Sequence, residues 1–273
     1  ADGSIEVSGT KTLEAFGSGK SLGTYTFKIT EQTRESEEGG YTYTDKEGGY
    51  SATTTNDAQG AFKFTLSYEL EGVGTYYYKI TEMAGTETGV VYDGTSYIIE
   101  VTVEDNNSGE LDVDYSIVEG GDAIAFTNYY DEVSAKVTGK KTYNLDLAGG
   151  EFSFILTDEE GNQVGNPVTN GADGSFEITT GTYNEPGEYT YTLKEVLPEG
   201  ATEENSYTVD GITYDPTEYE VTVTVSRSES TKELSASVRV AGTQDNEAAF
   251  TNTYGADGSI EVSGTKTLEA FGS

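Results

Sequence analysis

Three polar residues stand on the apolar faces of strand-like segments in the first half of the chain: Lys11, Glu82 and Asn128. Successive side chains of a strand point to opposite faces, so residues two apart share a face. The apolar residues on the same faces are Ile5 and Val7 for the lysine, Tyr78 and Ile80 for the glutamate, and Ile124 and Phe126 for the asparagine. The alternation therefore predicts that all three polar side chains point into a core.

The second half of the chain repeats this departure with Lys141, Glu195 and Asn252. Most other strand lysines follow the opposite rule and alternate against the apolar face: Lys28, Lys63, Lys79, Lys140 and Lys194. A lone buried lysine is costly because removal from water opposes its charge. The same costly choice in both halves of the chain calls for a chemical reason.

Two chemical readings of each set are open. In the first, lysine and glutamate form a buried ion pair, and asparagine is an additional hydrogen-bond partner. In the second, burial lowers the lysine pKa and raises the glutamate pKa, so that proton transfer leaves both groups neutral. A neutral amine is a nucleophile, and the asparagine side-chain amide is an electrophile. The protonated glutamate would hydrogen-bond and polarise the asparagine carbonyl and would shuttle protons as ammonia leaves.

Short strands must carry these residues, because Thr, Tyr, Val and Ile recur in alternating runs with no convincing helical pattern. Similar segments recur in the same order, for example "AIAFTNYY" (123–130) and "EAAFTNTY" (247–254). We therefore expect two related domains, at 1–131 and 132–255. Each reads as seven or more strands separated by turn signals, which indicates an all-β fold built of β-sandwiches.

The opening residues 1–18 recur without a difference at 256–273. This identity suggests one period of a longer array, in which 256–273 is the truncated start of the next repeat and supplies its first strand. Lys266 would then correspond to Lys11 and would stay unpaired, since its matching glutamate and asparagine would lie beyond residue 273. A rival is strand exchange, in which Lys266 reacts with Asn128 of another chain.

Composition excludes several classes of protein. The formal net charge is −34, spread along the sequence, which repels nucleic acid and disfavours anionic membranes. With no Cys and no His, disulfides, Cys or His metal sites and Ser-His-Asp catalysis are excluded. No apolar run could span a bilayer, so we expect no membrane insertion. We expect no cofactor and no metal site.

The motifs "GTKTLEA", "TYNEPGEYTYTLKEV", "DGITYD" and "AFTNTY" resemble the pilin isopeptide-linkage repeat of Gram-positive surface proteins. This repeat is found in streptococcal major pilins and in adhesin stalks of the Cna-B-like, reverse-immunoglobulin type. The resemblance implies bonds between Lys11 and Asn128 and between Lys141 and Asn252, with Glu82 and Glu195 as catalytic acids. It also implies that the first and last strands of each domain are parallel neighbours.

The resemblance further implies a structural stalk of an extracellular, cell-wall-anchored adhesin or pilus, stiffened by bonds that each domain makes once. Its partners would be neighbouring repeats, with a host or surface ligand bound elsewhere by a tip domain. A ligand-binding adhesin module is one alternative. A calcium-rigidified extender is another, because "EDNNSGELD" (104–112) is acidic, although it reads more simply as a hairpin turn. A turnover enzyme is not expected.

Overall fold

The computed structural model of the chain describes residues 2–255. Its described residues divide into two compact units. The first unit consists of 2–133 with 183–186 and 226–235, and the second consists of 134–182, 187–225 and 236–255. No α-helix occurs in this part of the chain, and two short 3-10 helices interrupt the strands, η1 (Leu70–Gly72) and η2 (Glu203–Asn205). The predicted all-β class is confirmed.

The first unit pairs its strands in two sheets, one of order β5-β1-β9 and one of order β3-β2-β6-β7-β8, with β4 pairing β2. Between residues 2 and 133 the strands are β1 (Asp2–Glu14), β2 (Thr26–Glu37), β3 (Gly40–Asp45), β4 (Ser51–Thr55), β5 (Ala61–Glu69), β6 (Gly74–Glu82), β7 (Ser96–Asp105), β8 (Leu111–Glu119) and β9 (Ala125–Tyr129).

The second unit repeats this plan with sheets of order β13-β10-β19-β16-β15 and β12-β11-β14-β17-β18. Its strands between residues 134 and 255 are β10 (Lys136–Tyr143), β11 (Ser153–Thr157), β12 (Gln163–Thr169), β13 (Ser175–Thr179), β14 (Gly187–Glu195), β15 (Thr208–Val209), β16 (Ile212–Thr213), β17 (Glu218–Arg227), β18 (Leu234–Val240) and β19 (Glu247–Tyr254).

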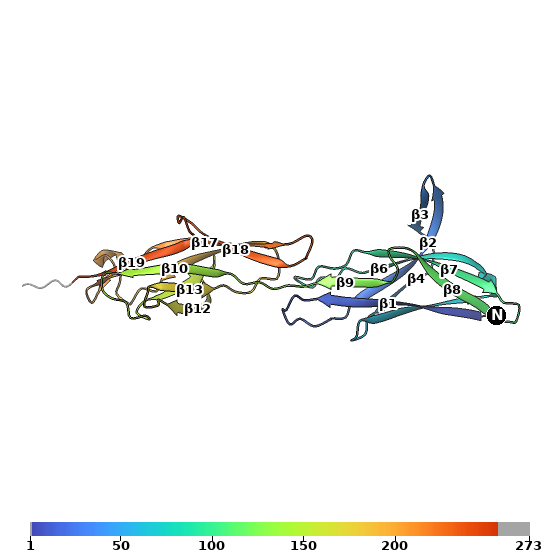
Figure 1. Ribbon diagram of the computed structural model, residues 1–273, viewed down its shortest axis with the longest axis horizontal. Helices are drawn as coiled ribbons and strands as arrows, with labels where there is room; N and C mark the ends of the chain where they lie inside the picture. The colour runs from blue at the N-terminus through green and yellow to red at the C-terminus, as the bar shows by residue number, and fades with distance from the viewer. Residues whose placement is uncertain (1, 256–273) are drawn as a thin grey trace, which may run out of the picture. The chain divides into compact units, whose positions relative to one another are not determined.

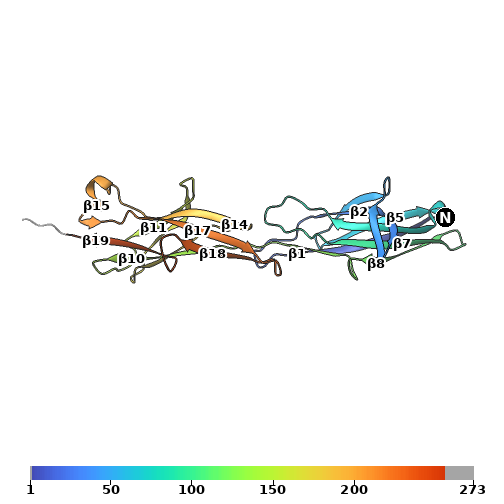
Figure 2. The same cartoon turned by 90° about the horizontal axis from the view of Figure 1, so that it is seen from above.

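The first and last strands of each unit are parallel neighbours, as the family resemblance implied. β1 pairs in parallel with β9, and β10 pairs in parallel with β19. The second pair lies side by side in both views of the ribbon (Figures 1 and 2). The first and last strands of each unit therefore lie next to each other in one sheet and run in the same direction.

Alternation along these strands creates each core. In the first unit, Phe27, Phe62 and Phe126 come from β2, β5 and β9 and are each at most 4% exposed. The rings of Phe27 and Phe62 stack with centroids 3.8 Å apart, which joins the two sheets into a sandwich. Phe154 and Phe176 repeat the same stack at 3.8 Å in the second unit.

Much of the 32–60 region of the first unit, which is rich in Glu and Gly, lies in strands β2, β3 and β4. The outer half of β2 pairs with β3, while its inner half pairs with β4. The β2–β3 hairpin projects away from the rest of its unit (Figure 1). The acidic segment 104–112 joins β7 to the antiparallel β8, so its interpretation as a hairpin turn is confirmed.

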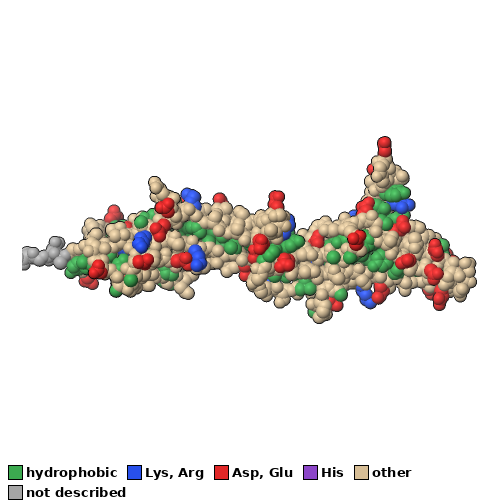
Figure 3. Space-filling view, in the orientation of Figure 1, with side chains coloured by type: hydrophobic (Ala, Val, Ile, Leu, Met, Phe, Trp, Pro, Cys, Tyr) green, Lys and Arg blue, Asp and Glu red, His purple; other side chains and the backbone are tan. Residues whose placement is uncertain are grey.

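Most charged side chains lie on the surface, and a few are buried. Asp and Glu are scattered over the visible face of both units instead of gathering in one patch (Figure 3). No helix between residues 2 and 255 has the length and apolarity that crossing a bilayer requires.

Candidate functional site

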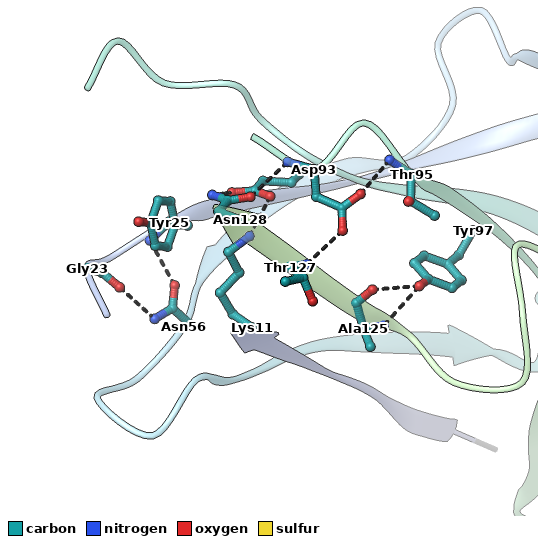
Figure 4. Close-up of polar contacts among 11 residues, drawn as sticks. Lys11, Gly23, Tyr25, Asn56, Asp93, Thr95, Tyr97, Ala125, Thr127 and Asn128 are labelled. Carbon is teal, nitrogen blue, oxygen red and sulfur yellow. Dashed lines mark hydrogen bonds and ion pairs between the residues drawn. The ribbon is translucent and has the colours of Figure 1, made fainter. Parts of the chain in front are cut away.

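The structure brings Lys11, Glu82 and Asn128 together in the core of the first unit. Lys11 Nζ donates a hydrogen bond of 2.7 Å to Glu82 Oε2, and Asn128 Nδ2 donates one of 2.7 Å to Glu82 Oε1. The three residues are 3%, 8% and 0% exposed, as the alternation predicted. One carboxylate therefore bridges the amine and the amide, and Figure 4 shows the lysine side chain rising toward the asparagine.

The second unit makes the same contacts with Lys141, Glu195 and Asn252. Lys141 Nζ donates to Glu195 Oε2 over 2.6 Å, and Asn252 Nδ2 donates to Glu195 Oε1 over 2.6 Å. These residues are 2%, 3% and 0% exposed. The cores of both units therefore hold the same buried triad.

Strand register places the lysine and the asparagine of each triad. Lys11 lies opposite Phe126, and Leu13 lies opposite Asn128, in the parallel pair β1–β9. Lys11 and Asn128 are thus diagonal neighbours on the core face, which long side chains can bridge. The β10–β19 pair has the same offset, because Lys141 lies opposite Phe250 and Tyr143 lies opposite Asn252.

Burial favours the neutral forms of both lysines and of Glu195. Burial lowers the pKa of Lys11 and of Lys141, against the opposing effect of their glutamate partners. Burial also raises the pKa of Glu195, against the opposing effect of Lys141. Aromatic rings line the amines, since Lys11 Nζ lies 4.9 Å from the Tyr25 ring centroid and Lys141 Nζ lies 4.7 Å from that of Phe152.

The asparagine carbonyl is held by a backbone group that the sequence did not reveal. Asp93 N–H donates a 2.8 Å hydrogen bond to Asn128 Oδ1. The expected bond from Glu82 to this carbonyl is not found. The physical reason is that a backbone N–H can face only the oxygen of the amide, which leaves Nδ2 to face the carboxylate. Glu82 thus contacts the Lys11 amine and the Asn128 side-chain nitrogen, while the Asp93 N–H contacts the Asn128 carbonyl oxygen.

The side chain of Asp93 fixes that backbone donor. Its carboxylate accepts hydrogen bonds from Thr127 N–H at 2.7 Å and from Thr95 N–H at 2.8 Å (Figure 4). Because Thr127 precedes Asn128 on β9, these bonds tie the 91–95 segment to the strand that carries the amide.

Asp215 repeats the arrangement in the second unit. Its N–H donates to Asn252 Oδ1 at 2.8 Å, and its carboxylate accepts from Thr251 N–H at 2.7 Å and Thr217 N–H at 3.0 Å. Both aspartates follow a tyrosine, in the Tyr-Asp pairs at 92–93 and 214–215. This shared dipeptide is the sequence signal that could have identified the two aspartates whose N–H groups contact the asparagine carbonyls.

Comparison with known proteins agrees with this geometry. The family model described as the Spy0128-like isopeptide-containing domain (FctA) matches residues 7–131 and again 137–255. The chain belongs to this family. The resemblance drawn from the sequence motifs is therefore confirmed.

Individual relatives are pilins. A pilin from Streptococcus pyogenes serotype M1 is 33% identical over an alignment of 152 residues, and the match covers 49% of this chain and 43% of that protein's length. The crystal structure of the major pilin from Streptococcus pyogenes is 21% identical, with 91% of this chain and 98% of that chain covered and a TM-score of 0.42. A major pilin from serotype GAS13637 is 15% identical, covering 92% and 98%, with a TM-score of 0.40.

In each Spy0128-like domain an asparagine also holds the aromatic residue beneath the lysine. Asn56 Oδ1 accepts a 2.8 Å hydrogen bond from Tyr25 N–H, and Asn170 Oδ1 accepts one of 2.8 Å from Phe152 N–H. These asparagines belong to the turn signals "NDAQG" and "NGADG". The sequence indicated turns there, but not their contact with the site.

In each Spy0128-like domain the backbone of the triad lysine lies close to the backbone of a glycine. Lys11 N–H donates to Gly60 O at 2.7 Å, and Lys141 N–H donates to Gly174 O at 2.7 Å. Gly60 has φ +88°, and a Cβ there would lie 2.1 Å from Lys11 O. Only glycine suits such a position.

Two further predictions concern Lys266 and the absence of a metal site. Lys266 and the proposed start of the next repeat lie outside the described residues. Among residues 2–255, no group of three or more acidic side chains is arranged to hold a metal ion.

Proposed function

We propose that each of the two domains, 1–131 and 132–255, forms its own isopeptide bond, Lys11–Asn128 in the first and Lys141–Asn252 in the second. The observation that supports this is the bridging carboxylate: one oxygen of Glu82 accepts from the amine and the other accepts from the amide. Glu195 does the same in the second domain. A simple ion pair does not need an asparagine on the second oxygen.

The reaction uses Glu82 as a proton shuttle. Glu82 Oε2 takes a proton from the Lys11 ammonium, and the neutral amine attacks Asn128 Cγ. Negative charge that develops on Asn128 Oδ1 is stabilised by the Asp93 N–H. Burial that lowers the pKa of Lys11 favours the neutral amine that begins this step.

Collapse of the tetrahedral intermediate completes the exchange. The C–Nδ2 bond breaks as the protonated Glu82 gives Nδ2 the proton that it took from Lys11, and Nδ2 leaves as ammonia. The new amide nitrogen then returns one proton to the carboxylate. The amide forms, one ammonia departs, and Glu82 ends protonated, so the charge is zero before and after. Each domain reacts once and consumes its own side chains.

The experiment is an intact mass of the purified chain followed by a tryptic map. We expect the mass to be lower than the sequence mass by two ammonia molecules. We also expect two cross-linked peptides, one joining Lys11 to Asn128 and one joining Lys141 to Asn252. A full sequence mass would leave the triads as buried ion pairs and would contradict the proposal.

We propose that the cross-linked domains serve as the stalk of a Gram-positive surface pilus or adhesin, outside the cell and anchored to its wall. Tension applied along the chain enters a domain by its first strand and leaves by its last. A bond between those parallel neighbours carries the load without unfolding the sandwich between them. Closing a loop of more than a hundred residues stabilises by up to about 5 kcal/mol on the chain-entropy argument. Neighbouring repeats are the partners, and a tip domain elsewhere binds the surface ligand.

A further inference from the structure

Each triad lysine has an aromatic ring beside its amine, and the residue that carries the ring lies just outside a strand. The Tyr25 ring centroid is 4.9 Å from Lys11 Nζ, and that of Phe152 is 4.7 Å from Lys141 Nζ. Tyr25 directly precedes β2 and Phe152 directly precedes β11, so the ladders of those strands do not hold them. The two aromatic residues are 5% and 4% exposed, and they keep water from the amines.

A buried asparagine holds the backbone of each of these aromatic residues. Asn56 Oδ1 accepts from Tyr25 N–H at 2.8 Å (Figure 4), and Asn56 N–H donates to Tyr25 O at 3.4 Å. Asn170 Oδ1 accepts from Phe152 N–H at 2.8 Å, and Asn170 N–H donates to Phe152 O at 3.2 Å. The asparagines are 6% and 2% exposed. In each domain one asparagine therefore binds both backbone polar groups of the residue beside the amine.

The turn that begins with this asparagine also holds the lysine strand. These clamp turns, 56–60 and 170–174, each end with a glycine. The carbonyl of Gly60 or Gly174 accepts from the N–H of the triad lysine at 2.7 Å. A further backbone bond closes each turn, since the glycine N–H donates to the carbonyl three residues earlier, at 3.0 and 2.9 Å. Each clamp turn thus fixes the aromatic residue at one end and the lysine backbone at the other.

Exclusion of water from the amine favours the neutral form that attacks. Burial is the strongest influence on the pKa of Lys11 and of Lys141, and it lowers both. An ammonium that reaches water keeps its proton, because hydration stabilises the charged form. A ring that moved away from the amine would admit water and would favour the resting ion pair over the neutral pair.

Building on the proposed isopeptide chemistry, we propose that Asn56 and Asn170 are positioning residues that speed bond formation by keeping the aromatic ring against the lysine amine. They act through Tyr25 and Phe152 and take no part in proton transfer. Both clamp turns have an asparagine and, four residues later, a glycine, although the residues between them differ, Asp-Ala-Gln in one turn and Gly-Ala-Asp in the other. The shared ends of the turns are the parts that contact the aromatic residue and the lysine.

The test is Asn170→Ala in the full chain, with the rate of the Lys141–Asn252 bond measured against pH. Chain recovered unfolded and unreacted in denaturant is refolded by dilution, quenched in acid at successive times and mapped by mass spectrometry. The rate should follow a bell-shaped profile, because the reactive pair shares one proton. In the variant the acid limb should move to lower pH and the alkaline limb to higher pH, since a hydrated site favours both charged groups. The plateau should fall about tenfold for each pH unit by which the limbs separate.

The charged and titratable surroundings of the pair stay the same in this variant. Lys141 faces Glu195 and Asp215, and Glu195 also faces Tyr214. None of these residues is altered, so movement of the limbs reports the hydration of the pair. The bond of the first domain is formed in the same molecule and should keep its rate.

Asn205→Ala is the matched control. Asn205 also accepts from a backbone N–H, that of Thr202 at 2.9 Å, and donates to a backbone carbonyl, that of Gly200 at 2.7 Å. These bonds close a loop of the second domain and do not involve Phe152. This variant should leave the plateau and both limbs unchanged.

Two further variants keep the proposal open to contradiction. Asn56→Ala should slow the first bond and spare the second. Phe152→Leu keeps the backbone bonds and an apolar side chain but covers less of the amine, so it should separate the limbs in the same direction even if Asn170→Ala fails to fold. Unmoved limbs in Phe152→Leu would overturn the proposal, because the asparagine acts through that ring.

The remaining outcomes are equally definite. A lower plateau with unmoved limbs in Asn170→Ala would indicate a loss of folded protein alone and would overturn the proposal, as would an unchanged profile. If the unaltered chain forms neither bond, the isopeptide proposal itself fails, and that outcome is visible before any variant is made.

Discussion

The two domains hold the same triad inside different surroundings. Both bridge a lysine and an asparagine through one carboxylate, at 2.7 Å in the first domain and 2.6 Å in the second. Their first and last strands share one register, with the lysine diagonal to the asparagine. Residues carried by these paired strands therefore coincide, because moving any one would shift a whole ladder of hydrogen bonds.

The part of the larger sheet around β2 and β3, by contrast, differs from its counterpart in the second domain. β2 has 12 residues and continues into the projecting hairpin with β3, whereas its counterpart β11 has 5. Arg34 stabilises the projection by lying between the rings of Tyr41 and Tyr77, at 4.3 and 4.4 Å from their centroids. This insertion leaves the triad geometry unchanged, which shows that a sheet edge can vary while the core site does not.

The largest expected effect is loss of one bond at a time. Glu82→Ala should abolish the Lys11–Asn128 bond and spare the second, and Glu195→Ala should do the reverse. Without its bond, and with a buried lysine left unpaired, each domain should lose about 5 kcal/mol of unfolding free energy. Intact mass should show one ammonia lost instead of two, and calorimetry should show one domain melting earlier.

Glu31→Ala is the matched control for this experiment. Glu31 is also a buried glutamate of the first domain, 8% exposed, and it accepts from Lys46 Nζ at 2.6 Å and from Tyr50 N–H at 2.9 Å. This variant should lose stability but keep both bonds. Full ammonia loss in Glu82→Ala would show that the carboxylate is not needed for the chemistry.

A smaller effect is expected from the aspartates that aim the backbone donor. Asp93→Ala keeps the N–H but removes its two anchors on Thr95 and Thr127, so the donor loses its fixed direction. We expect the first bond to form about tenfold more slowly, below the loss reported for deleting an oxyanion donor outright. Time-resolved refolding with peptide mapping measures this rate.

Asp215→Ala should give the same slowing at the second bond only. Asp105→Ala is the control, because Asp105 also accepts a backbone hydrogen bond in a turn, from Asn107 N–H, but stands far from the triad in the β7–β8 hairpin. Equal rates in Asp93→Ala and Asp105→Ala would remove the aspartate from the mechanism.

The strand residues of the site could be predicted from the sequence, and the loop residues could not. Alternation along β1, β6 and β9 placed Lys11, Glu82 and Asn128 on the core-facing sides of their strands, since period two leaves no other choice once the apolar face is known. Asp93 and Tyr25 precede strands β7 and β2, where no periodicity applies. Their positions depend on contacts with residues distant in sequence, such as Thr127 and Asn56.

A change in core packing should lower the stability of a domain and leave its isopeptide bond formation unchanged. A Cβ on Gly9 would lie 2.2 Å from Phe62 Cζ, and one on Gly139 would lie 2.1 Å from Phe176 Cζ. Gly9→Ala and Gly139→Ala must therefore displace the stacked ring, which costs about 1–3 kcal/mol. We expect earlier thermal unfolding of the altered domain, measured with its bond intact by mass.

Two other glycines provide controls for this change. A Cβ on Gly40 or on Gly181 would meet nothing within 4 Å, and neither has a positive φ. Gly40→Ala and Gly181→Ala should leave the melting of their domains almost unchanged. An equal loss of stability in all four variants would mean that the close glycine–phenylalanine approach is not what packs the two sheets.

The smallest effect is a pH dependence of bond formation, expected to have two limbs in the second domain. Below the acid limb Glu195 and Lys141 are both protonated, and the amine cannot attack. Burial raises the pKa of Glu195 above its ordinary 4.5, so the rate should begin to fall at a pH above that value.

Above the alkaline limb the pair has lost its shared proton, and no acid remains for the leaving nitrogen. Burial lowers the pKa of Lys141 below its ordinary 10.5, so this fall should begin below that pH. Initial rates of the Lys141–Asn252 peptide, measured on refolding at successive pH values, should therefore form a bell with a plateau between the limbs. A rate that keeps rising past pH 10.5 would mean that the amine gives its proton to solvent and not to Glu195, and the two oxygens of the carboxylate would then have no joint role.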